Sequence, residues 1–543
     1  MNVRMKKSIV FTLFIVLITG ARGQIHPTRA YPGLFDTVQR SGIFSDSKTF
    51  PDCKALYPTD SIRKHFSMQR NHPSFNLKEF VGAHFDTSTK VPSFNPKSYQ
   101  SIEEHIRNLW PIITRKDLTG GKNHTTRIRL PRPYVVPGGR FNEMYYWDSY
   151  FTLLGLEVSG NDTLIEDMVY NYAYLIDKYG FIPNGTRSYF MTRSQPPFWF
   201  LMINLYLRNK YHHDILNETP QEAPSSTNFI NELSALLQNL EKEHTFWMRG
   251  KHSLTKQKRT KNHLIRLGPN NILNRYYDQG TTPRPESYTE DIHLSGSSEQ
   301  KPAVLYKNTR AACESGWDFS SRWMVDGRNL ETINTLSIIP VDLNALLFGM
   351  EAMIAKSYRI LRKPQAATRW KQKAAQRKKL VNEYLWNEQE GYYYDYNYEK
   401  QAHTANTTLA GVFPLFLEMA SQQQAEKVAR KLNRSFLKDG GMVTTLTNTN
   451  QQWDYPNGWP PLQWITFVGL TNYGYDDLAM EAARRWLNLN KQVFRKTGKM
   501  MEKYNVVDTT LMSGGGEYPT QDGFGWTNGV YLKMLEELNS KTR

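Results

Sequence analysis

The chain has 543 residues, of which 39% are hydrophobic and 22% charged, a balance that supports a large folded core and excludes wholesale disorder. The net charge is +17, and four of the positive charges lie in the first 23 residues and seven in residues 249–266. The segment 249–266 has no acidic residues and no interleaved aromatic residues, so we interpret it as a solvated loop. No nucleic-acid partner is therefore expected. Two cysteines exclude a disulfide scaffold and a cysteine-built metal cluster.

Residues 1–23 have the pattern of a secretory signal peptide. A basic head at residues 4–7 precedes the 13-residue, mostly apolar run 8–20 (SIVFTLFIVLITG), and small residues follow at positions 21 and 23. The run is shorter than the roughly 20 apolar residues of a membrane-spanning helix. We therefore expect a cleaved signal, a secreted, extracellular protein, and no membrane anchor in the mature chain.

Export changes the interpretation of two other features. Cys53 and Cys313 are far apart in sequence, and we expect a buried, unpaired Cys313 rather than a disulfide. Glycosylation of the Asn-x-Ser/Thr triplets would require exposed positions. These triplets begin at Asn123, Asn161, Asn184, Asn217, Asn406 and Asn433.

Helical periodicity dominates the remainder, which we expect to be one large all-α catalytic domain over residues 24–543. Helices are predicted at 163–178, 196–209, 226–248, 341–361, 364–386, 409–437, 476–495 and 526–540. A short hairpin is predicted at 391–397. The segments 131–148, 281–286, 313–323, 452–464 and 502–526 are rich in Gly, Pro, Trp and Asp, and we expect these loops to gather at one end of the domain.

The predicted loops contain three Trp-Asp pairs, which suit a sugar because an indole covers the apolar face of a pyranose and a carboxylate accepts bonds from its hydroxyls. Cleavage of a glycoside requires two carboxyl groups with divided roles, one protonated and one ionised. Composition does not say which two among the candidates. The candidates are Glu143, Asp148, Glu286, Glu314, Asp318, Asp454, Glu502, Glu517 and Asp522.

The same loops hold Arg140, Arg193, Arg284 and Arg322, whose forked donors suit vicinal hydroxyls. The glycine run 514–516 is not followed by Lys-Ser/Thr, so it is interpreted as a lid carrying Glu517 rather than as a phosphate-binding loop. No His-Glu-x-x-His pattern is present, and we expect neither a metal nor an organic cofactor.

Four loop motifs resemble the trehalases, glycoside hydrolase family 37, and are closest to its secreted, insect-like animal branch. They are PGGRFNEMYYWDSYF (137–151), ESGWDFSSRW (314–323), QWDYPNGWPP (452–461) and GGGEYPTQDGFGWTNG (514–529). The resemblance implies an (α/α)6 barrel and hydrolysis of the small disaccharide α,α-trehalose to two glucose molecules with inversion.

The resemblance also implies roles for individual residues. The general acid falls on Asp318 and the general base on Glu502, which should lie about 6.5–9.5 Å apart to admit a water. Implied sugar-binding residues are Arg140, Trp147, Asp148, Asn184, Arg193, Ser194, Gln195, Arg284, Pro285, Glu286, Gly316 and Glu517.

Two other functions are weighed against this one. Another inverting α-glucosidase or glucoamylase on an α-helical barrel would use the same two-carboxylate chemistry on a different substrate. A catalytically dead sugar-binding protein would lack the acid or the base, but Asp318 and Glu502 are both present.

Overall fold

The computed structural model describes residues 25–87, 101–117, 124–511, 520–521 and 523–542. The predicted signal peptide, the first sequon at Asn123, the glycine run with Glu517, and Asp522 lie outside these described residues.

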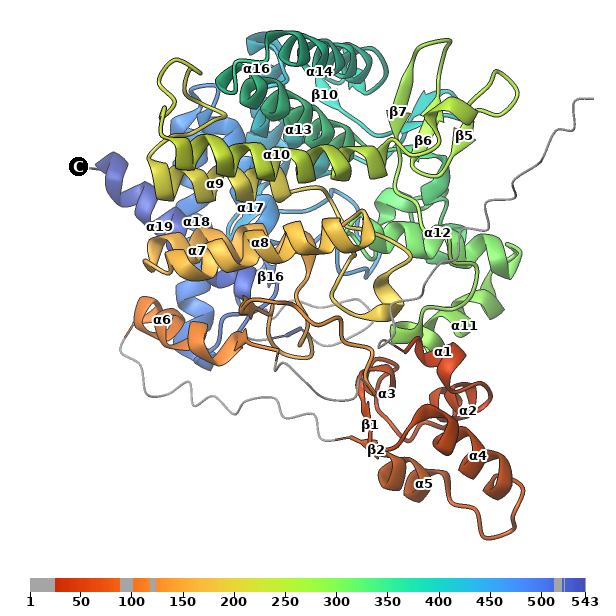
Figure 1. The fold of residues 1–543 in the computed structure, drawn as a ribbon. Coiled ribbons are helices and arrows are strands. Elements are labelled where there is room, and N and C mark those ends of the chain that lie inside the picture. The colour runs from red at the N-terminus through yellow and green to blue at the C-terminus, as the bar shows by residue number, and fades with distance from the viewer. Residues whose placement is uncertain (1–24, 88–100, 118–123, 512–519, 522, 543) are drawn as a thin grey trace, which may run out of the picture.

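The domain is built mainly of helices (Figure 1), and six inner helices contact one another in a closed ring with outer helices between them in sequence, so the predicted (α/α)6 barrel is confirmed. The inner helices are α7 (Tyr146–Val158), α9 (Trp199–Tyr211), α13 (Val341–Ile360), α15 (Phe413–Phe416), α17 (Pro460–Thr471) and α19 (Gly525–Thr542). The outer helices are α6 (Ile102–Ile113), α8 (Asp162–Tyr179), α10 (Thr227–Trp247), α14 (Pro364–Tyr384), α16 (Gln422–Lys431) and α18 (Asp476–Thr497). None of the helices in the described part of the chain has both the length and the apolarity to cross a bilayer.

The two rings differ in how their helices bury side chains. An outer helix such as α14 buries one stripe, including Trp370 and Leu380, and exposes its lysine-rich face to solvent. The inner helix α7 is buried at every position from 146 to 156. A helix that is buried on all sides has no polar stripe, so it carries no amphipathic signal in the sequence.

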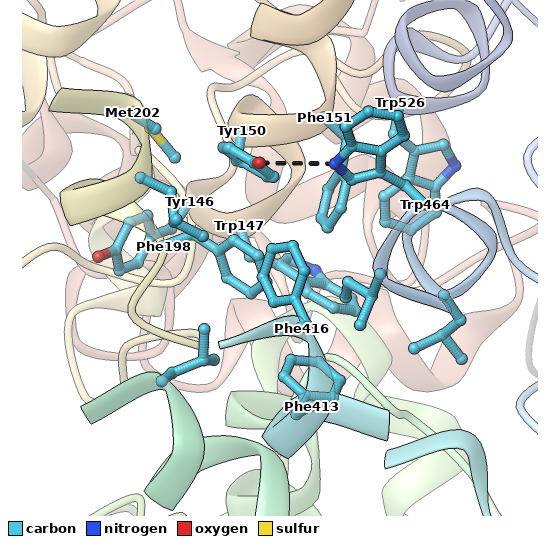
Figure 2. Packing of buried hydrophobic residues seen from close by; sticks show 14 of the residues in the cluster. Tyr146, Trp147, Tyr150, Phe151, Phe198, Met202, Phe413, Phe416, Trp464 and Trp526 are labelled. Carbon is cyan, nitrogen blue, oxygen red and sulfur yellow. Dashed lines mark hydrogen bonds between the residues drawn. The ribbon is translucent and has the colours of Figure 1, made fainter. Parts of the chain in front are cut away.

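Large aromatic side chains fill the axis of the barrel between the inner helices (Figure 2). Tyr150 and Phe151 of α7 pack on Phe198, with ring centroids 5.3 Å apart in both pairs. Trp464 of α17 donates from Nε1 to the Tyr150 hydroxyl at 3.5 Å. This aromatic layer supports the first turn of α7, where Trp147 begins the site described below.

Two glycines let the helices α7 and α19 touch backbone to backbone. A Cβ on Gly155 would lie 2.5 Å from the Cα of Gly529, and a Cβ on Gly529 would overlap the Phe151 carbonyl. Only glycine allows this approach, because real Cβ atoms do not come within 3.0 Å of a neighbouring atom. The contact joins the first inner helix to the sixth and closes the ring.

An N-terminal unit with a hydrophobic core of its own packs beside the barrel (Figure 1). It comprises α1 (Pro27–Ala30), α2 (Leu34–Ser41), α3 (Thr49–Asp52), α4 (Thr59–Gln69), α5 (Leu77–His84) and the paired strands β1 (Lys54–Ala55) and β2 (Phe85–Asp86). Its core reaches Tyr288 at the start of α11 (Tyr288–Ser297), which is followed by α12 (Pro302–Glu314). The unit therefore lies against the loops that carry the barrel's site residues.

The predicted helix over 409–437 is wrong in its continuity. The chain forms a short turn over Leu409–Val412, the helix α15, a break, the helix α16 and a π-helical turn over Leu432–Phe436. Glu418 takes a left-handed φ of 52° within the break. Ser421 then starts α16 with a capping box to Gln424, a local bond pattern that competes with a continuous helix.

The predicted hairpin over 391–397 contributes strands to two different pairings. Strand β10 (Tyr392–Tyr393) pairs with β9 (Trp386–Asn387), while β11 (Tyr396–Asn397) pairs with β12 (Ala402–His403) and β8 (Ile338–Ile339). The remaining short strands are β3 (Thr114–Arg115), β4 (Tyr134–Val135), β5 (Thr260–Lys261), β6 (Leu264–Arg266), β7 (Ile272–Asn274), β13 (Leu437–Lys438), β14 (Gly441–Met442), β15 (Asn457–Gly458) and β16 (Tyr504–Asn505).

Candidate active site

A cavity of about 740 Å³, open mouth included, lies where the loops preceding the inner helices converge. Eleven of the fourteen residues predicted for the site line it: Arg140, Trp147, Asp148, Asn184, Arg193, Gln195, Arg284, Glu286, Gly316, Asp318 and Glu502. Ser194 and Pro285 stand directly beside lining residues, and Glu517 lies outside the described chain.

Asp318 and Glu502 face this cavity from loops that are far apart in sequence. Both are close enough to Asp148, in the first turn of α7, to influence its pKa electrostatically. Burial, with smaller contributions from the nearby Glu502 and Asp318, raises the pKa of the Asp148 carboxyl to about 8. Asp148 is therefore protonated at neutral pH, and three carboxyl groups line the same cavity near one another.

The loop that carries Asp318 is held at both ends. Gly316, with φ 75°, lies so close to Trp147 that a Cβ would come within 2.8 Å of its indole. After Asp318, the carboxylate of Asp454 accepts hydrogen bonds from the hydroxyls of Ser320 and Ser321, each at 2.8 Å. Asp454 therefore anchors the loop that carries Asp318 and does not line the cavity.

The loop that carries Glu502 is fixed mainly through its backbone. The amide of Glu502 donates to the Gln521 carbonyl at 2.9 Å, and its carbonyl accepts from the Trp526 indole at 3.0 Å. Directly afterwards, strand β16 pairs with β15, so the loop is joined to the segment that precedes α17. The side chain of Glu502 is only 1% exposed.

Arg193 and Glu286 form a buried ion pair on the cavity wall, with Nη2 and Oε1 2.7 Å apart. Burial alone would raise the pKa of Glu286, but Arg193, Arg284 and Arg310 outweigh it and lower that pKa. Within the described residues, Nε of Arg193 and Oε2 of Glu286 are buried and have no hydrogen-bond partner. A sugar hydroxyl can accept a hydrogen bond from Nε of Arg193 or donate one to Oε2 of Glu286.

Three further predicted residues fasten neighbouring loops to one another. The Gln195 carboxamide oxygen accepts from the Trp147 amide at 3.1 Å, at the start of α7. Asn184 is 4% exposed and donates from Nδ2 to the carbonyls of Ser194 (3.3 Å) and Cys313 (3.4 Å). Cys313 is a buried thiol rather than half of a disulfide, as expected, and its sulfur accepts from Nη1 of Arg284 at 3.2 Å.

Ser194 and Pro285, the two described residues of the predicted site that do not line the cavity, form hydrogen bonds beside it. The Ser194 hydroxyl donates to the Ile182 carbonyl at 2.6 Å, and the Pro285 carbonyl accepts from Gln39 of the N-terminal unit at 2.9 Å. Arg284, beside Pro285, is held by a fork of bonds to Asp291, the shortest of 2.6 Å.

Other candidates from the sequence have structural partners. Glu314 accepts from the amides of Ser194 and Tyr277 at 2.8 and 2.7 Å. Arg322 is fully buried between Asp342 and Asp395. These residues shape the loops around the cavity but do not line it.

Flat aromatic faces form much of the wall. Trp453 and Trp459 stack with ring centroids 3.9 Å apart and planes 1° apart, and Phe524 and Trp526 line the cavity beside them. Such faces suit the apolar C–H surface of a pyranose. Trp317, the tryptophan of the Trp-Asp pair that contains Asp318, does not line the cavity and stacks on Trp453 with ring centroids 5.4 Å apart.

Sequence reasoning missed Lys48, which the N-terminal unit brings to the cavity. Its ammonium lies 2.5 Å from Asp52 and 2.7 Å from Glu143, whose other oxygen is 3.0 Å from Arg187. Burial alone would raise the pKa of Glu143, but Lys48 and Arg187 bring it down to about 2. No local sequence motif marks Lys48, because its role depends on contact between two separate hydrophobic cores.

Also missed was the aromatic wall formed by Phe141, Tyr145 and Phe190. The Tyr145 hydroxyl donates to Glu143 at 2.7 Å, so the ion-pair network around Lys48 fixes this wall. Among the described residues, no group of three or more His, Cys, Asp or Glu is arranged to hold a metal ion.

Comparisons with known proteins agree with this chemistry. A family model described as trehalase matches residues 42–539. The periplasmic trehalase of Pseudomonas aeruginosa is 42% identical over 94% of this chain and 90% of its own, and that of Citrobacter koseri is 42% identical over 94% and 86%. The neutral trehalase structure from Saccharomyces cerevisiae superposes with a TM-score of 0.61 at 25% identity, covering 82% of this chain and 81% of the other. The chain therefore belongs to the trehalase family and is an α,α-trehalase, a glycoside hydrolase that cleaves trehalose.

Proposed function

We propose that the chain hydrolyses α,α-trehalose by a single inverting displacement in which Asp318 is the general acid and Glu502 the general base. One observation carries this proposal: Asp318 and Glu502 line the same cavity from opposite parts of the sequence, and both act on the buried Asp148. Two carboxyl groups at one site are the requirement for cleaving a glycoside in this way.

In the proposed reaction Asp318 gives its proton to the oxygen that bridges the two glucose units. Glu502 takes a proton from a water, and this water attacks the anomeric carbon from the opposite face as the bridging bond breaks. The products are one glucose in the β form and one in the α form. A separation of about 6.5–9.5 Å between the two carboxyl groups would leave room for the water.

The other lining residues support substrate binding in this proposal. Arg193 and Glu286 offer a buried donor and a buried acceptor for sugar hydroxyls, and the stacked Trp453 and Trp459 offer an apolar face. Protonated Asp148 supplies a neutral O–H donor without adding a second negative charge near the ionised Glu502. The remaining predicted contact, Glu517, is part of the proposal from the sequence alone.

Replacing either proposed carboxyl tests the roles directly. Asp318→Asn and Glu502→Gln are each expected to lower kcat by at least ~10²-fold, as the loss of a general acid or base does. The matched control is Asp508→Asn, an exposed carboxylate in the same loop as Glu502, which should keep wild-type turnover. Wild-type rates in either cavity variant would remove that residue from its role.

Product stereochemistry tests the inversion. Proton NMR in the first minutes of trehalose hydrolysis should show equal amounts of α- and β-glucose, whereas only the α form would indicate retention. Maltose serves as the comparison substrate, since preference for maltose over trehalose would favour the alternative α-glucosidase function.

The proposal extends to export and domain organisation. Cleavage of a signal peptide at residues 1–23 would leave one secreted catalytic domain, 24–543, and the similarity to periplasmic trehalases supports export. Sequencing the N-terminus of the exported protein tests this cleavage. In a glycosylating host Asn184 should stay unmodified, because it is buried and its amide nitrogen is already bonded. Glycopeptide mapping that found Asn184 largely occupied would contradict this.

A further inference from the structure

Lys503, the residue after Glu502, is a buried cation inside the active-site wall. Its side chain is fully buried, and its ammonium lies 3.1 Å from Oε2 of Glu502 and 5.1 Å from the centroid of the Trp459 ring. A buried ammonium is costly unless charges and hydrogen-bond acceptors compensate it. Its placement beside the proposed base therefore calls for a functional explanation.

Gln452 links this cation to the loop of the proposed acid. Its carboxamide oxygen accepts from the Lys503 ammonium at 3.1 Å, and its Nε2 donates to the backbone carbonyl of Asp318 at 2.5 Å. Gln452 is itself fixed, because its own carbonyl accepts from the Trp459 indole at 2.9 Å and from Asn457 at 3.1 Å. The chain of contacts thus runs from the carboxylate of Glu502 to the backbone of Asp318.

We infer that Lys503 and Gln452 are positioning residues that hold the proposed base and the proposed acid at a fixed separation across the substrate. Asp318 and Glu502 come from loops that share no secondary-structure element, so a direct link between them is needed to keep the space for one water constant. Neither positioning residue lines the cavity, so neither contacts the sugar in this arrangement. The inference rests on the proposed roles of Asp318 and Glu502.

The experiment compares Lys503→Met, Gln452→Leu and the double variant with the control Lys496→Met, which removes an exposed lysine at the end of α18. A displacement near 1 Å costs about 10²-fold in rate, so we expect kcat for trehalose to fall by about 10- to 100-fold in both single variants, with KM within about threefold of wild type. The double variant should be no slower than the slower single variant, because both act through one linkage.

Several results would overturn the inference. These are a rise in KM with kcat unchanged, or effects that multiply in the double variant. If Lys503→Met does not fold, Gln452→Leu decides, because it leaves the ion pair with Glu502 intact. Wild-type turnover in Glu502→Gln would instead refute the proposed function, whereas an inactive Glu502→Gln with fully active Lys503→Met and Gln452→Leu would refute only the positioning role.

Discussion

Replacing Asp148 by asparagine should make the protein more stable at neutral pH. The folded protein binds a proton on Asp148 up to a pKa of about 8, whereas the unfolded chain releases it near the ordinary value of 3.8. Between these two values each rise in pH favours the unfolded state by about 1.36 kcal/mol per unit. At pH 7 the cost of keeping Asp148 buried is therefore about 4 kcal/mol, and Asn has the same shape without an acidic proton to lose.

The assay is thermal unfolding of wild type and Asp148→Asn at pH 7 and at pH 4. With an unfolding entropy of about 2.1 cal/mol/K per residue, a gain of about 4 kcal/mol corresponds to a rise of about 4 °C in Tm for a chain of 543 residues. Near pH 4 the unfolded chain also holds much of its proton, so the gain should nearly vanish. Asp508→Asn, at an exposed site, should show no such gain at pH 7.

Two outcomes would refute this reasoning. A gain of equal size at both pH values would mean that the substitution acts through packing rather than through proton binding. A loss of stability at pH 7 would mean that Asp148 is ionised in the folded protein. Lower trehalase activity in the stabilised variant would agree with the proposal that Asp148 contacts the sugar, since functional sites commonly sacrifice stability.

Four further changes have defined outcomes. Gly316→Ala should lower kcat/KM by at least ~10-fold with the fold retained in circular dichroism, because its Cβ would press on Trp147 at a position with φ 75°. Gly529→Ala should destabilise the barrel by about 3 kcal/mol or prevent folding, measured by urea denaturation, because the added methyl meets backbone on the facing helix. Lys48→Met should cost about 3 kcal/mol at pH 7, since it leaves the buried carboxylate of Glu143 with one cation fewer. Glu143 keeps its charge down to a pKa of about 2, so the stability it contributes is present above about pH 4.5 and is lost as the pH falls towards 2; Glu143→Gln should abolish that loss in acid denaturation.

The sequence predicted the outer helices better than the inner ones, and the reason is physical. Helices such as α14 and α18 face water on one side, so their residues alternate with helical periodicity. Helices α7 and α17 are buried on nearly all sides, and their first residues fell in segments predicted as loops. Their existence depends on neighbours that the local sequence does not reveal.

The candidate site shows the same division. Loop motifs indicated the lining residues around Trp147, Asp318 and Glu502, and the structure gathers them at one cavity. Composition could not separate Asp454, which anchors a loop, from carboxylates that line the cavity. Lys48 was missed because its function comes from contact between two separate cores rather than from a motif.

The backbone contact between Gly155 and Gly529 also constrains how the enzyme is made. Because α7 and α19 are separated by most of the polypeptide, the circle of helices stays open on the ribosome until α19 has emerged. Trp147 and Trp526, which the two helices contribute to the cavity, meet only at that step. A nascent chain that stops short of α19 would thus expose the hydrophobic inner surface of α7 to chaperones or to aggregation. Its sugar-binding cavity would also remain incomplete.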